Sequence, residues 1–81
     1  MEWYVISFVN THTAISAQKH LKESFELIIM PTPRELSQGC GISIRYSAED
    51  HPAVAERLLE LSFDQQKYSI HGYSNGGYSI V

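Results

Sequence analysis

One side chain of this sequence stands out as a candidate nucleophile: Cys40, the single cysteine among 81 residues. It lies between Gly39 and Gly41, at the end of a segment that begins at Pro31. Because glycine has no side chain, these two neighbours leave the sulfur uncrowded and let another molecule approach the backbone closely. We therefore expect an exposed thiol that acts as a nucleophile or holds a transferred sulfur atom.

Few groups near Cys40 in the sequence could favour its thiolate form. The backbone amides of Gly41 and Ile42 follow the cysteine directly, and Arg34 lies on the same loop. Arg45 lies on the next predicted strand, where it could simply solvate the sheet. The C-terminal end of a helical turn before the cysteine would oppose a negative charge. Arg34 is therefore the preferred activating residue.

The residues that lead to Cys40 carry signals of a rigid loop. Thr32 and Glu35 have the spacing of a capping box, and Pro33 occupies the first helical position that would follow. These signals predict a single helical turn over residues 33–37. Gly39 can then adopt the left-handed conformation that ends such a turn.

The four histidines do not form a metal-binding motif. His12 and His20 would lie about two turns apart on a helix, too far for one ion to bridge, and the sequence has no C-x-x-C or H-E-x-x-H pattern. His71 could act as a base for Cys40, but the topology predicted below places its strand at the opposite edge of the sheet from the loop. His51 is expected at the start of a helix. We predict no metal and no cofactor.

Composition and charge exclude several classes of protein. The formal net charge is −3, which argues against binding to a phosphate backbone. No apolar run approaches the ~20 residues of a membrane span. A single cysteine cannot form an internal disulfide, which favours a reducing compartment, the cytoplasm. An apolar share of 43% is ordinary for a globular domain.

Alternation and helical periodicity predict the elements that position the loop. Ile42–Ser47 (ISIRYS) alternates apolar and polar residues, which is typical of a strand with one polar face. Asp50, followed by Pro52, marks the start of a helix. In chain order we expect a strand over Trp3–Val9, a helix over Thr11–Ser24, strands over Phe25–Met30 and Ile42–Ser47, a helix from His51, and a strand over Lys67–Tyr73.

This order, β-α-β-β-α-β, predicts a ferredoxin-like α+β sandwich, an antiparallel sheet with both helices on one face. Residues 1–81 are expected to form one domain, with residues 75–81 as a frayed tail or an extra edge strand. The second face of the sheet, lined by Trp3, Val5 and Val9, is expected to be open to a partner or to a second copy of the chain. Three tyrosines are expected at an interface or at the rim of the core: Tyr68, Tyr73 and Tyr78.

The segment Pro31–Gly41 (PTPRELSQGCG), after a strand–helix–strand opening, resembles the selenium/sulfur carrier protein-like family of small bacterial proteins. The resemblance is specific across P-T-P-R-x-x-S-x-G-C-G and the His12–Ala14 region. It implies that a reduced sulfur or selenium atom is carried on Cys40, received from a donor such as a cysteine desulfurase and passed to an acceptor protein. It also implies a set of supporting loop residues: Arg34, Ser37, Gly39 and Gly41.

Two hypotheses about function follow. The first is a sulfur or selenium carrier, rather than a turnover enzyme, that acts through a persulfide on Cys40. The second is a ferredoxin-like binding or regulatory module that takes a small ligand or a protein partner on its open sheet face. In the second case Cys40 is a small structural residue.

Overall fold

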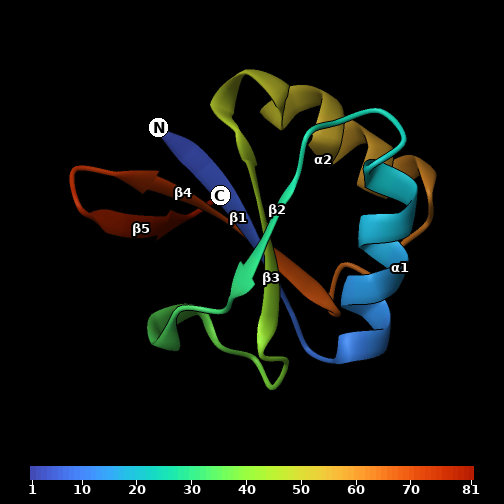
Figure 1. Ribbon diagram of the computed structural model, residues 1–81, viewed down its shortest axis with the longest axis horizontal. Coiled ribbons are helices and arrows are strands. Elements are labelled where there is room, and N and C mark those ends of the chain that lie inside the picture. The colour runs from blue at the N-terminus through green and yellow to red at the C-terminus, as the bar shows by residue number, and fades with distance from the viewer.

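Five strands form one antiparallel sheet, and two α-helices pack on one of its faces, in the computed structural model, which describes residues 1–81. Both helices lie to the right of the strands in Figure 1. Neither helix is long and apolar enough to cross a bilayer. In chain order the elements are β1 (Trp3–Phe8), α1 (Thr11–Leu21), β2 (Ile28–Pro31), the 3₁₀ turn η1 (Arg34–Leu36), β3 (Ile42–Ser47), the 3₁₀ turn η2 (Ala48–Asp50), α2 (His51–Glu60), β4 (Tyr68–Ser74) and β5 (Gly77–Ile80).

The strand order β2-β3-β1-β4-β5 confirms the predicted ferredoxin-like fold. Its first four strands have the order that two interleaved β-α-β units produce, with β1 and β3 at the centre and every pair antiparallel. The fifth strand is an addition at the β4 edge, where Tyr73 pairs with Tyr78. The C-terminal segment is therefore an extra edge strand rather than a frayed tail.

The main core lies between the sheet and the helices. Ile6 and Phe8 point from β1 toward the helices, because alternate residues of a strand face the same side. Tyr4 lies on the same face and packs at the edge of this core. The helices contribute five buried residues to it: Ala14, Ala17 and Leu21 from α1, and Val54 and Leu58 from α2.

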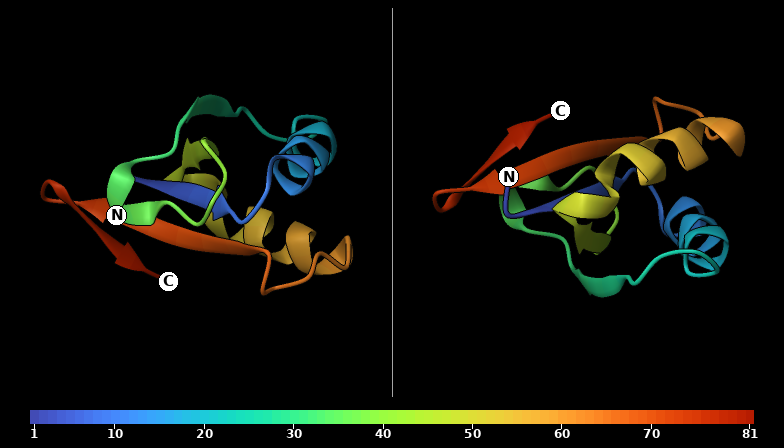
Figure 2. Two further views of the ribbon diagram at one scale, coloured as in Figure 1. Left: turned by 90° about the horizontal axis from the view of Figure 1, so that it is seen from below. Right: turned by 90° about the horizontal axis from the view of Figure 1, so that it is seen from above.

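The second face of the sheet is covered by the chain itself, contrary to the sequence-based expectation. Val5 is fully buried, and Val9 follows the end of β1. Trp3 is partly buried, because its ring stacks on Tyr73 at 4.2 Å between centroids and the Arg45 guanidinium lies 4.1 Å from its centre. The β4–β5 hairpin and the segment containing η1 lie on the side opposite the helices (Figure 1), and Figure 2 shows the same arrangement from below and above.

Two element boundaries differ from those predicted. Helix α1 ends at Leu21 rather than Ser24, because the chain tightens into a turn over residues 22–24, where the Ser24 amide donates to the Leu21 carbonyl at 3.1 Å. Strand β2 begins at Ile28 rather than Phe25. Phe25 and Leu27 instead pack against the core from the connecting segment, so their apolar character serves tertiary contacts.

Candidate functional site

The sulfur of Cys40 lies where the loop after β2 meets the start of β3. The backbone N–H of Ile42 donates to Sγ at 3.3 Å, and the Ile42 carbonyl lies 3.4 Å away, where it can accept from the thiol. The hydroxyl of Thr11 lies 3.7 Å from Sγ. Of the two amides expected to face the sulfur, the structure supplies that of Ile42.

The expectation that Cys40 is exposed is wrong. The residue is 1% exposed and belongs to the main core, together with Phe8 and Ala14. It is buried because the loop turns its side chain inward, beneath the start of α1. Thr11, which contacts the sulfur, is itself exposed.

The first residue of α1 contacts this sulfur through its side chain. Asn10 caps the helix, its side chain accepting from the Thr13 amide at 2.8 Å, and Thr11 is the first helical residue. The backbone amides of the first turn of α1 make no hydrogen bond to Sγ, so the contact is made by the Thr11 hydroxyl alone. Sequence reasoning missed it because Thr11 and Cys40 lie 29 positions apart.

The two glycines that flank Cys40 have different roles. Gly39 has a φ of +117°, and a Cβ there would lie 2.9 Å from the Val9 carbonyl oxygen. The backbone conformation and the close approach to the end of β1 therefore both require glycine. A Cβ on Gly41 would have no atom within 4 Å, so that position leaves open space beside the cysteine.

The loop contains the predicted turn, but the capping box is absent. A 3₁₀ turn, η1, covers Arg34–Leu36, and no side chain caps its start at Pro33. The hydroxyl of Thr32 is buried without a hydrogen-bond partner. Its backbone N–H instead donates to the Gly41 carbonyl at 3.0 Å, which closes the base of the loop. Leu36 is buried and anchors the turn.

The structure does not bring the remaining predicted residues to the sulfur. Arg34 and Ser37 are exposed on the loop, and the Ser37 amide donates to the Arg34 carbonyl at 3.3 Å. Arg45 lies over Trp3, on the sheet face opposite the core that contains Cys40. Neither arginine makes a hydrogen bond to Cys40.

A second polar cluster joins the same loop to the sheet. The Gln38 side-chain amide donates to Ser7 Oγ at 2.7 Å, and Ser7 Oγ lies 3.3 Å from His71 Nε2. Burial lowers the pKa of His71. His71 therefore contacts Ser7, which is bonded to the loop, and it does not contact Cys40. Gln38 was not singled out from the sequence, because nothing local marks a glutamine for a contact 31 positions away.

A third cluster connects β1, β3 and α2. The Tyr46 hydroxyl and His51 Nδ1 lie 2.8 Å apart, and the Tyr4 ring stacks on the His51 ring with 3.8 Å between centroids. Burial raises the pKa of Tyr46, with a smaller contribution from Tyr4, and burial lowers the pKa of His51. Near neutral pH both groups are therefore uncharged, and the tautomer of the imidazole sets which of the two donates the hydrogen bond. No group of three or more His, Cys, Asp or Glu side chains has the arrangement of a metal site.

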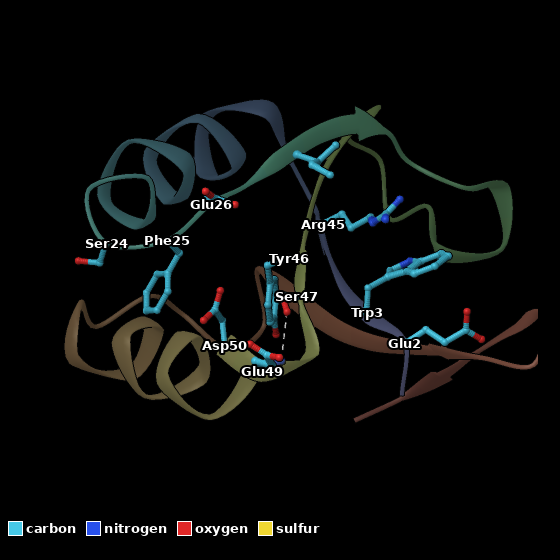
Figure 3. A pocket seen from close by; sticks show the side chains of 11 residues that line it. Glu2, Trp3, Ser24, Phe25, Glu26, Arg45, Tyr46, Ser47, Glu49 and Asp50 are labelled. Carbon is cyan, nitrogen blue, oxygen red and sulfur yellow. Dashed lines mark hydrogen bonds between the residues drawn. The ribbon is translucent and has the colours of Figure 1, made fainter.

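A groove of about 550 Å³ lies at the opposite end of the central strands from Cys40. It is lined where β1 begins and β3 ends, whereas Cys40 lies where β1 ends and β3 begins. Figure 3 shows the Arg45 side chain beside the Trp3 ring at one side of this groove, with Tyr46 and Phe25 farther along it. Four carboxylates also line it: Glu2, Glu26, Glu49 and Asp50.

Together the fold and the site define a class: a ferredoxin-like α+β domain with one cysteine at the junction of its β2–β3 loop and the start of its first helix. The family model described as "Putative Se/S carrier protein-like" matches residues 3–68. The chain belongs to this family. The match includes the whole Cys40 loop and ends at the first residue of β4, so β5 lies outside it.

One curated relative gives a more distant match. It is an uncharacterized protein of Methanocaldococcus jannaschii, 28% identical over 71 residues. The match covers 86% of this chain and 36% of the relative, so the chain spans about a third of that protein's length. No solved structure gives a significant match.

Proposed function

We propose that this protein carries a reduced sulfur or selenium atom on Cys40. The observation that supports the proposal best is the setting of the sulfur, which contacts the Ile42 amide and the hydroxyl of Thr11, the first residue of α1. Both groups can donate hydrogen bonds to a sulfur anion. Membership of the Se/S carrier-like family is consistent with this role.

The proposed transfer is redox-neutral. The Cys40 thiolate attacks the terminal sulfur of a persulfide on a donor protein such as a cysteine desulfurase. A new S–S bond forms on Cys40, the donor's S–S bond breaks, and the donor cysteine leaves as a thiolate. Attack by an acceptor thiolate on the outer sulfur then returns Cys40 to its thiolate form. Selenium in the outer position would follow the same route.

Burial of Cys40 gives the carrier a protected resting state. A core position excludes water and small thiols from the sulfur, and it also prevents a donor from reaching it. Loading and unloading therefore require a local movement of the loop or of the start of α1. The exposed positions of Thr11 and of residues 37–39 allow such a movement without disruption of the helix–sheet core.

The test is sulfur loading from a cysteine desulfurase supplied with cysteine that carries a heavy sulfur isotope. Intact-mass measurement is expected to show one added sulfur atom on the wild-type chain and none on Cys40→Ser. A reducing agent should remove the added mass. Wild-type protein without an adduct, under conditions in which the desulfurase loads a known acceptor, would contradict the carrier function.

A second candidate function is favoured by the low exposure of Cys40. If the cysteine is only a core residue, the protein is a binding or regulatory module of the ferredoxin-like type, which takes a small ligand or a protein partner. This function predicts no adduct on wild-type protein, whereas a loss of stability in Cys40→Ser is expected under both functions because the residue is buried. The mass measurement on wild-type protein therefore separates the two functions.

A further inference from the structure

The loop that ends at Cys40 wraps around the end of β1. Gln38 bonds to Ser7 on the sheet face away from the helices, and Gly39 passes against the Val9 carbonyl. Cys40 then enters the core on the helix side. Two consecutive peptide units thus carry the chain from one face of the sheet to the other, and the Gln38 contact lies just before the crossing.

The Gln38–Ser7 hydrogen bond is the only side-chain hydrogen bond that residues 32–39 make. The other hydrogen bonds that hold this segment are backbone contacts within the loop, such as that from the Leu36 amide to the Pro33 carbonyl at 2.9 Å. Ser37, Gln38 and Gly39 are exposed, so they have little apolar burial to hold them in place.

Ser7 is a firm attachment point for this bond. It is fully buried on the central strand β1, and its oxygen accepts from Gln38 at 2.7 Å. Because the oxygen already accepts this hydrogen, its own proton is available to His71 Nε2, 3.3 Å away on β4. These two contacts fix the Ser7 side chain. Of its two partners, Gln38 is the exposed one, so it can move away into solvent.

We propose that the Gln38–Ser7 hydrogen bond is a latch. It holds residues 37–41 against the end of β1 and so keeps the Cys40 side chain in the core. When it breaks, the exposed segment swings away from β1 and draws the cysteine out of the core, while the helices and the rest of the sheet keep their packing. That this opening admits a sulfur donor rests on the proposed carrier function. The opening itself does not depend on it.

The test is the rate at which a disulfide reagent, dithiobis(nitrobenzoate), reacts with Cys40 in the folded protein. Loss of one hydrogen bond from the closed state is expected to make the reaction of Gln38→Ala about 3- to 10-fold faster than that of wild type. Ser37→Ala is the matched control, since Ser37 is exposed next to Gln38 and its side chain makes no hydrogen bond; its rate should equal the wild-type rate.

Urea separates local opening from global unfolding. If the latch opens locally, the rate in Gln38→Ala should depend only weakly on low urea concentrations, because little surface is exposed in the open state. Ser7→Ala should accelerate the reaction too, and the double variant Gln38→Ala/Ser7→Ala should react no faster than the faster single variant.

Either of two results overturns the latch. One is a Gln38→Ala rate equal to that of wild type and Ser37→Ala. The other is an acceleration whose urea dependence matches that of global unfolding, since Cys40 would then react only from the unfolded chain. Neither measurement involves sulfur loading. A failed latch therefore leaves the carrier proposal standing, and a failed loading experiment leaves the latch standing.

Discussion

At the scale of single residues, the two glycines beside Cys40 look alike in the sequence and differ in the structure. Gly39 combines a positive φ with the approach to Val9, whereas Gly41 has open space around its α-carbon. The first glycine is a requirement of the backbone and the second is not. The prediction that a missing side chain leaves space beside Cys40 is therefore correct for Gly41 and not for Gly39.

We expect Gly39→Ala to reduce the free energy of unfolding by about 1–3 kcal/mol, because alanine would be strained at this φ and would press on the Val9 carbonyl. Gly41→Ala is the control and should change stability by less than about 0.5 kcal/mol. Urea denaturation of the two variants provides the comparison. Equal losses in both would show that the position of Gly39 against β1 is not a constraint.

Sequence reasoning predicted the donor from Ile42 and the positive φ of Gly39, because both depend on residues near Cys40 in the chain. It did not predict the burial of the sulfur. Burial depends on Thr11 and on the core of the whole domain, which only the folded topology brings together. The Gln38–Ser7 contact was missed for the same reason.

At the scale of elements, α2 shows how sharply burial divides neighbouring side chains. Leu58 is fully buried in the main core, whereas the next residue, Leu59, is 56% exposed. A residue turns by about 100° from its predecessor around a helix axis, which is enough to move a side chain from the sheet to solvent.

Leu58→Ala is expected to lower the free energy of unfolding by about 2–5 kcal/mol, through lost burial and the cavity left behind. Leu59→Ala removes the same atoms from a largely exposed position and should cost less than about 1 kcal/mol. Urea denaturation measures both. The two variants are a matched pair, because they truncate adjacent leucines of the same helix. Similar losses would contradict the orientation of α2 against the sheet.

The bounds of β3 and the start of α2 agree with those predicted, because clean alternation and a proline at the helix start are local signals. The capping box at Thr32 failed for a physical reason: the N-cap of the turn is Pro33, whose side chain cannot accept a hydrogen bond, and the buried Thr32 hydroxyl has no partner. Strand β2 was placed too early because apolar residues of a connecting segment resemble those of a strand.

At the scale of the whole molecule, two histidines link stability to pH. Burial lowers the pKa of His51 and of His71, each from an ordinary value of 6.5. The unfolded chain therefore binds protons more readily than the folded protein in the interval below 6.5. Stability should be complete above this pH and should fall as the pH drops through the lowered folded-state values.

We expect the urea midpoint to decrease between pH 8 and pH 5, and His51→Asn to reduce this decrease. The asparagine oxygen can still accept from the Tyr46 hydroxyl, but it does not titrate. His12→Asn is the control, because His12 is exposed on the first turn of α1. A midpoint that stays constant over this range, or that His12→Asn alters as much as His51→Asn does, would contradict the assignment.

The stack of Trp3 between the Arg45 guanidinium and the Tyr73 ring has a practical consequence. Trp3 is the only tryptophan of the chain and lies at the first residue of β1, whereas the Cys40 loop crosses β1 at its far end. Indole fluorescence and thiol labelling therefore act as two intrinsic, spatially separate reporters. Recorded together, they can show whether the two ends of the central strand come apart in one step or in sequence.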